Sequence, residues 1–120
     1  MRRAEIWWAE LPPPSGRRPV VLLSRDTAYS VRAMVAVAPV TTRVRGLAVE
    51  LPLGPEEGMT KPCVANLDTI QTIAKALLKA RITYLPHAKR QALDDAIRFA
   101  LGMDEETSGS PKLEPAPPAA

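Results

Sequence analysis

Short apolar runs separated by polar corners dominate the first part of the chain. Residues 5–11 (EIWWAEL) are rich in aromatic and branched side chains, which favour strands. Pro12 ends this run, because proline cannot donate to a sheet ladder. The apolar runs 20–24 and 32–40 are short and bounded by polar residues, so they predict two further buried strands.

Period-two alternation marks the next element. Apolar side chains at positions 47, 49 and 51 are separated by Ala48 and Glu50. This spacing predicts a strand with one buried face and one wet face, on which Glu50 lies. Three more short strands are predicted at 63–67, 68–73 and 82–85.

A single amphipathic helix is predicted near the C-terminus. Pro86 suits the first turn of a helix because its φ angle is fixed. Leu93, Ile97 and Leu101 fall on one face at helical spacing, and Gly102 stands where a C-cap is expected. Several short strands closed by one helix predict a small barrel-like sheet of the α+β class.

Composition restricts the kinds of site that such a domain can hold. The chain has 120 residues, of which 46% are hydrophobic and 4% aromatic, so one domain with an aliphatic core is expected. No apolar run approaches the ~20 residues of a membrane helix, and the start does not resemble a signal peptide. The single Cys63 and single His87 exclude an internal disulfide, a cysteine-built zinc site and a two-histidine acid–base pair. We therefore expect a reduced, cytoplasmic domain without a metal or cofactor.

Charge divides the chain at residue 102. The segment 103–120 has four acidic residues and one lysine, so it contributes −3 to a formal net charge of +3 and leaves residues 1–102 at +6. A basic body suits a polyanion partner, although ordinary solubility explains the same charge. The segment is rich in proline and poor in apolar side chains, which predicts a disordered acidic tail after a folded domain.

Two polar clusters stand beside predicted buried strands. Arg17 and Arg18 lie in the loop before one strand, and Thr41, Thr42 and Arg43 follow another. A guanidinium matches phosphate oxygens and stays charged, and a threonine hydroxyl can donate to a phosphate. Together they can bind a scissile phosphate and stabilise its developing charge. The alternative is that all five residues solvate the strand ends.

Five motifs occur in order along the chain: EIWWAEL (5–11), RRPV (17–20), VAPVT (37–41), KPCVANLD (61–68) and IQTI (70–73). Together they resemble the MazF/PemK/Kid toxins of bacterial type II toxin–antitoxin systems, over roughly residues 2–102. The resemblance implies an SH3-like β-barrel (CcdB/MazF-like) with a C-terminal α-helix, and a homodimer. It also implies a metal-independent, sequence-specific endoribonuclease that cleaves single-stranded RNA (an mRNA interferase), and a cognate MazE-like antitoxin.

The resemblance implies a catalytic pair. The family's arginine before the proline of the second strand corresponds to Arg18, and the threonine that closes the third strand corresponds to Thr41. Attack of the ribose 2′-hydroxyl on the adjacent phosphate would give 2′,3′-cyclic phosphate and 5′-hydroxyl ends, and no general base is assigned. Candidate RNA contacts are Arg17, Thr42, Arg43 and Arg45, together with Asp68, Thr69 and Gln71, which the resemblance implies.

Other readings of the same residues stay open. A CcdB-type toxin shares the barrel and poisons gyrase by binding alone, and an inactive RNA-binding remnant is a third possibility. Cys63 is expected to be a small buried residue and His87 a surface residue. Trp7 and Trp8 point to opposite faces of their strand, so one is expected in the core and the other is available to stack on bases.

Overall fold

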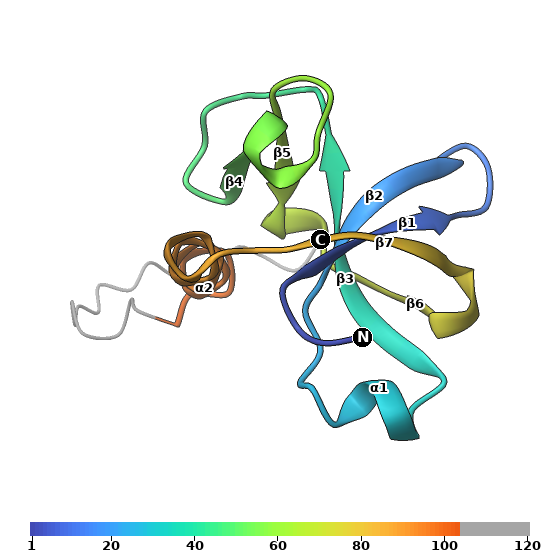
Figure 1. Ribbon diagram of the computed structural model, residues 1–120. Coiled ribbons are helices and arrows are strands. Elements are labelled where there is room, and N and C mark those ends of the chain that lie inside the picture. The colour runs from blue at the N-terminus through green and yellow to red at the C-terminus, as the bar shows by residue number, and fades with distance from the viewer. Residues whose placement is uncertain (104–120) are drawn as a thin grey trace, which may run out of the picture.

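Within residues 1–103, which the computed structural model describes, seven strands form one curled antiparallel sheet (Figure 1). The order is β4-β5-β3-β2-β1-β7, and β6 pairs with β3. The predicted α+β barrel with a C-terminal helix is confirmed. Of the predicted tail (103–120), all residues after Met103 lie outside the described part of the chain. The strands are β1 (Glu5–Glu10), β2 (Arg17–Leu22), β3 (Met34–Thr41), β4 (Glu50–Leu53), β5 (Cys63–Asn66), β6 (Gln71–Ala74) and β7 (Leu78–Tyr84).

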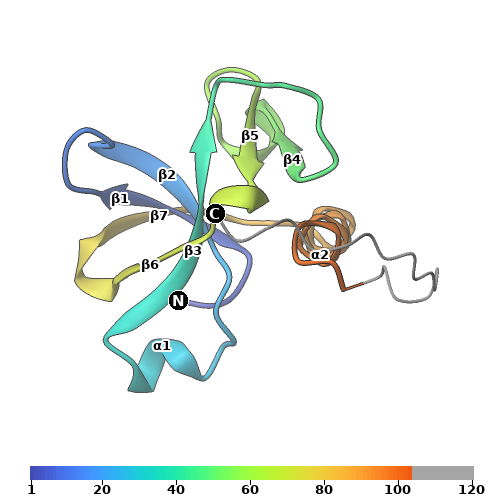
Figure 2. The ribbon, with the colours of Figure 1, turned by 180° about the vertical axis from the view of Figure 1, so that it is seen from behind.

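Short helical segments connect these strands. The helix α1 (Ala28–Val31) was not predicted, and it lies at the end of the barrel away from β4 and β5 (Figure 1, Figure 2). Its Tyr29 is buried and donates a hydrogen bond to the Ser24 carbonyl at 3.1 Å. The remaining segments are the 3₁₀ turns η1 (Pro55–Glu57), η2 (Leu67–Thr69) and η3 (Lys75–Leu77), and the helix α2 (His87–Ala100).

The hairpin of β1 and β2 corrects one expectation about the arginines. Arg17 and Arg18 belong to β2, opposite Glu10 and Ala9 of β1, and not to the preceding loop. The backbone pairing of β1 with β2 extends to Arg17, beyond the apolar run that begins at Val20, because backbone hydrogen bonds do not require apolar side chains. Arg18 is therefore held by a strand in the middle of the sheet.

The middle sections of the central strands β2 and β3 are covered on both faces, which explains why they are apolar at every position. Val20 and Val37 belong to one core cluster, whereas Val21 and Ala38 belong to another. All four side chains have an exposed fraction of 0%. Since both faces are covered, the two strands form a rigid platform that ends at Thr41.

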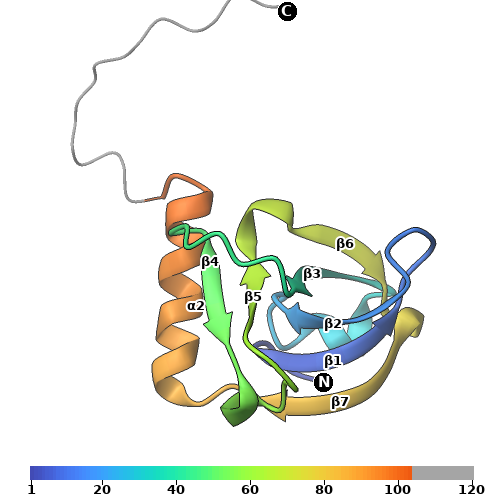
Figure 3. The ribbon, with the colours of Figure 1, turned by 90° about the horizontal axis from the view of Figure 1, so that it is seen from above.

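The helix α2 covers the β4–β5 end of the barrel, where it lies beside β4 (Figure 3). Leu93 is fully buried there, as its spacing predicts, and Gly102 adopts a φ of +71° after the helix. Leu101 is instead 61% exposed, because the last turn of the helix extends past the core. Among residues 1–103, no helix is long and apolar enough to cross a membrane.

Strand β4 corrects a second expectation. It begins at Glu50, and Leu47 lies in the preceding loop with 48% of its surface exposed. Glu50, which was expected on the wet face, is only 8% exposed. Its carboxylate folds back onto backbone N–H groups of that loop, and the hydrogen bonds they donate hold it in this buried position.

Candidate functional site

A polar pocket of about 190 Å³ lies beside the end of β3, and we call it the arginine pocket. It collects side chains from β2, β3, β4, β5, η2 and the loop after β3. Five of the predicted site residues meet there: Arg18, Thr41, Arg43, Arg45 and Thr69. The pocket is completed by Pro39, Glu50 and Asn66, of which the sequence had suggested none as a site residue.

Arg18 carries an unsatisfied donor in this pocket. Its Nε atom is buried and has no hydrogen-bond partner among the described residues. An unmade hydrogen bond to a buried polar group costs about 1–3 kcal/mol, and more where the group is charged. The Arg18 side chain as a whole is half-buried and lines the pocket, so an anion that enters there meets the charge of its guanidinium.

Thr41 is oriented by the chain that follows it. Its Oγ1 accepts a hydrogen bond from the backbone N–H of Arg43 at 3.1 Å. A hydroxyl that accepts through one lone pair keeps its O–H available for donation. Thr41 can therefore donate to an anion in the arginine pocket.

Glu50 anchors the loop that carries the other two arginines. Its Oε1 accepts from the backbone N–H groups of Arg45 at 3.0 Å, Gly46 at 2.8 Å and Leu47 at 3.3 Å. Burial acts to raise the pKa of the Glu50 carboxyl, but these three donors and the charge of Arg45 together lower it below its ordinary value. The carboxylate stays ionised, and its Oε1 is engaged by the loop.

Asn66 organises the opposite wall through an Asx turn. Its Oδ1 accepts from the backbone N–H of Asp68 at 2.9 Å, and the Thr69 hydroxyl donates to its backbone carbonyl at 3.3 Å. The signal for this role is the Asn-Leu-Asp-Thr sequence, in which an asparagine starts a turn by capping the residue two positions later.

Four predicted RNA contacts lie outside the arginine pocket. The Arg17 guanidinium lies over the Trp8 ring, 4.7 Å from its centroid. Thr42 faces a neighbouring apolar cavity. Asp68, at η2, and Gln71, the first residue of β6, are exposed and line neither of these two pockets.

The chemistry of the arginine pocket suits a phosphate group. Three guanidinium groups and the Thr41 hydroxyl supply donors, and one carboxylate is present. No three His, Cys, Asp or Glu side chains within residues 1–103 could hold a metal ion together. Arg18, Arg43 and Arg45 supply positive charge that would meet a phosphate in the pocket.

Cys63 and His87 lie as the sequence predicts, whereas neither tryptophan is fully buried in the core. Trp7 and Trp8 are each partly buried; Trp7 packs on one core cluster and Trp8 lines the apolar cavity. Cys63 is 5% exposed, and burial, with the charge of Glu57, raises the pKa of its thiol. His87 is exposed, as expected.

Several known proteins are similar to this chain. Probable endoribonuclease MazF5 of Mycobacterium tuberculosis (strain ATCC 25618 / H37Rv) is 38% identical over 100 residues, which cover 82% of this chain and 91% of that protein. Endoribonuclease MazF3 of the same species (strain CDC 1551 / Oshkosh) is 40% identical over 87 residues, covering 72% and 84%.

Solved structures share the fold. Mycobacterium tuberculosis toxin MazF-mt6 superposes with a TM-score of 0.77 at 38% identity, covering 83% of this chain and 98% of that one. A mycobacterial endoribonuclease in complex with its cognate antitoxin has the same fold, with a TM-score of 0.75 at 23% identity over 86% and 96% of the two chains. Residues 2–101 match the family described as the PemK-like, MazF-like toxin of type II toxin–antitoxin systems. The chain belongs to this toxin family.

Proposed function

We propose that this chain is the endoribonuclease toxin of a type II toxin–antitoxin pair and cuts single-stranded RNA at short sequences without a metal ion. Its curated relatives are named endoribonucleases. The observation that carries the mechanism is the meeting of Arg18 and Thr41 in one pocket, with the buried Nε of Arg18 lacking a partner within the described chain. Cleavage of messages in this way would arrest translation and growth.

The proposed reaction is an intramolecular transfer at phosphorus. The ribose 2′-hydroxyl loses its proton as its oxygen attacks the adjacent phosphorus, the bond from phosphorus to the 5′-oxygen breaks, and the 5′-oxygen takes up a proton. The products are a 2′,3′-cyclic phosphate and a 5′-hydroxyl. Arg18 stabilises the charge that develops on the phosphorane, and Thr41 donates to a phosphate oxygen and positions it.

Glu50 is unsuited to accept the 2′-hydroxyl proton. It lines the arginine pocket, but its Oε1 already accepts three backbone hydrogen bonds. Its pKa is lowered, since these donors outweigh the effect of burial, which makes it a weak base. We therefore assign Glu50 to loop positioning and name no general base.

The other RNA contacts surround the central phosphate. Arg43 and Arg45 would hold it or the neighbouring phosphates from inside the pocket. Thr69, whose hydroxyl donates to the Asn66 carbonyl, would accept a hydrogen bond from a base edge. Arg17 and Thr42 would contact the strand beside it. Asp68 and Gln71 are exposed on either side of Thr69, where they would meet base edges.

The proposed partners follow from the family and the charge. A cognate MazE-like antitoxin with an extended acidic segment would occupy the arginine pocket and block RNA. The toxin would act as a homodimer in the cytoplasm. A CcdB-type gyrase poison is not favoured, because the curated relatives are endoribonucleases and the Arg18–Thr41 pair serves no purpose in binding alone.

The test compares purified wild-type protein with Arg18→Ala on a long single-stranded RNA. Arg32→Ala is the matched control, because Arg32 is exposed after α1 and lines none of the pockets described above. Wild type and Arg32→Ala are expected to cut the RNA at the same sites, and Arg18→Ala is expected to leave it intact. Equal cleavage by a folded Arg18→Ala protein would contradict the assignment.

A further inference from the structure

We propose that the apolar cavity next to the arginine pocket binds one pyrimidine base of the RNA, an inference that rests on the proposed nuclease function. We call it the Trp8 cavity. Its apolar walls come from β1, β2, β3, β5 and the loop before β5. The walls are formed by Trp8, Pro19, Val40, Met59 and Cys63.

The size of the Trp8 cavity fits a single aromatic ring. Its volume is about 170 Å³. An apolar cavity of about 150 Å³ in another protein stays dry and binds benzene. A six-membered pyrimidine ring matches that size, whereas the fused rings of a purine are larger. The cavity can therefore hold a pyrimidine ring as a whole, whereas part of a purine would extend out of it.

The Trp8 cavity and the arginine pocket are adjacent. Thr41, one of the proposed catalytic residues, lines both. A base in the cavity would consequently belong to a nucleotide next to the phosphate that is cut. On the Trp8 side of the cavity, the Arg17 guanidinium lies 4.7 Å from the Trp8 ring centroid and supplies positive charge for a flanking phosphate. The arginine pocket, the Trp8 cavity and Arg17 thus offer sites for a phosphate, a base and a second phosphate in turn. An RNA strand can occupy all three, whereas an isolated apolar side chain would occupy the cavity alone.

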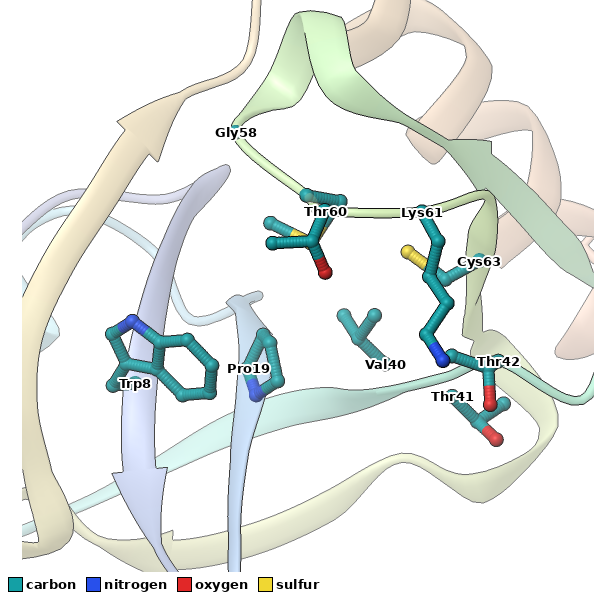
Figure 4. Close-up of a pocket in the computed structure, with 10 residues that line it drawn as sticks. Trp8, Pro19, Val40, Thr41, Thr42, Gly58, Thr60, Lys61 and Cys63 are labelled. Carbon is teal, nitrogen blue, oxygen red and sulfur yellow. The ribbon is translucent and has the colours of Figure 1, made fainter.

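Polar groups at the rim suit the edge of a pyrimidine. Figure 4 shows the Thr60 hydroxyl turned into the cavity and the Lys61 side chain extending toward Thr42. Both pyrimidines carry a carbonyl oxygen at position 2, which Lys61 and Thr60 can meet with donors. Ligand sites commonly combine apolar walls with a few such polar groups.

The loop that carries these groups has a defined shape. Gly58 has a φ of +87°, a conformation that strains other residues. A Cβ on Gly58 would also lie 2.9 Å from Cγ2 of Ile82. The chain thus turns tightly at Gly58 and presents Thr60 and Lys61 to the cavity opposite Trp8 (Figure 4).

The test fills the cavity and measures base preference next to the cut. Thr60→Phe places a ring at an exposed loop position that lines the cavity. Thr27→Phe is the matched control, because Thr27 is exposed at α1 and its side chain makes no capping hydrogen bond. Each protein cuts a single-stranded RNA randomised in sequence, and the fragment ends are sequenced.

Wild type and Thr27→Phe are expected to prefer pyrimidine over purine at least about tenfold at one of the two positions flanking the cut. Thr60→Phe is expected to lose that preference. Replacing the same nucleotide by an abasic ribose should lower wild-type kcat/KM about tenfold and leave that of Thr60→Phe unaffected. Lys61→Met, which keeps the side-chain stem, should weaken the preference without filling the cavity.

A preference that survives Thr60→Phe and Lys61→Met, or no preference at either position, would overturn the base subsite while leaving the nuclease intact. The cavity would then be assigned to an apolar side chain of a protein partner. If wild type cuts no RNA, the proposed function fails, and the base subsite is tested by binding instead.

Fluorescence anisotropy then compares short labelled oligonucleotides that carry either a pyrimidine or an abasic site. Wild type that binds the pyrimidine oligonucleotide at least about fivefold tighter, with no such difference for Thr60→Phe, supports the subsite. Equal binding of the two oligonucleotides by wild type contradicts the subsite.

Discussion

The carboxylate of Glu50 accepts a hydrogen bond from the backbone N–H of Gly46 at 2.8 Å. This contact joins the first residue of β4 to the loop after β3. The same loop carries Arg43 and Arg45 into the arginine pocket. The position of two cationic side chains thus depends on one buried anion.

Loss of the Glu50 anchor is expected to weaken RNA binding. Glu50→Ala should release the loop and raise KM about tenfold, with a smaller effect on kcat, because Arg43 and Arg45 would hold substrate and transition state alike. Glu50→Gln keeps one acceptor oxygen and should have an intermediate effect. The control is Glu56→Ala at the exposed η1. A change in kcat alone would assign Glu50 to the chemical step instead.

Acid should destabilise the protein through two buried carboxyl groups, Glu5 and Glu50. Burial acts to raise the pKa of Glu5, but the donors Trp7 and Arg2 and the charge of Arg81 together lower it below its ordinary value of 4.5. The pKa of Glu50 is lowered as well, because backbone donors outweigh burial. The folded state therefore binds fewer protons than the unfolded state does, and this stabilisation is complete above pH 4.5 and lost as pH falls through the lower folded pKa values.

Urea unfolding measured across this pH range checks the expectation. The free energy of unfolding of wild type should be level above about pH 5 and fall as the solution becomes more acidic. Glu5→Gln should reduce the slope of that fall. A wild-type protein whose stability increases on acidification would contradict the assignment of these two carboxyl groups.

The sequence was informative where local patterns decide the structure. Local patterns placed Arg18 and Thr41 in two polar clusters beside buried strands, and the resemblance to the toxin family singled them out as a pair. Helical spacing identified Leu93 as buried. Glu50 could not be found, because alternation places it on a wet face and its burial depends on amides of a loop that folds back. The same limit applies to Leu101: periodicity defines the face of a helix but not the point where the core beneath it ends. Asn66 required recognition of a turn within an apparent strand.

Each member of the proposed catalytic pair should be indispensable. Arg18→Ala and Thr41→Ala are each expected to lower kcat at least about a hundredfold, the effect of losing one transition-state donor. Arg18→Lys should also fail, because an ammonium group lacks the planar fork of a guanidinium. Thr41→Ser keeps the hydroxyl and should retain most of the activity. Single-turnover kinetics on proteins with verified circular dichroism spectra would measure these effects.

RNA binding should depend steeply on salt. Neutralisation of phosphates by arginines releases counterions, so the logarithm of the affinity falls linearly with that of the salt concentration. Arg43→Ala and Arg45→Ala should each reduce the slope by roughly 0.7 for single-stranded RNA. Arg32→Ala should leave it unaltered, since Arg32 lies outside the pockets described above. Slopes identical in all three variants would exclude the two arginines as phosphate contacts.

The protein is expected to form a homodimer in solution. Its core is built mainly from aliphatic side chains, and a domain of this size buries a limited share of its surface on folding. Association with a second copy adds buried surface, most simply around a two-fold axis. Multi-angle light scattering at micromolar concentration should report twice the mass of the chain. A monomer would contradict the proposed assembly.

The chemistry of the cut ends tests the central claim most directly. Purified protein is incubated with single-stranded RNA in excess EDTA, and the fragment ends are identified by mass spectrometry. The Arg18–Thr41 mechanism predicts undiminished cleavage that leaves 2′,3′-cyclic phosphate and 5′-hydroxyl ends, and no cleavage by Arg18→Ala. Cleavage that stops in EDTA and returns with magnesium, or fragments with 5′-phosphate ends, would contradict it.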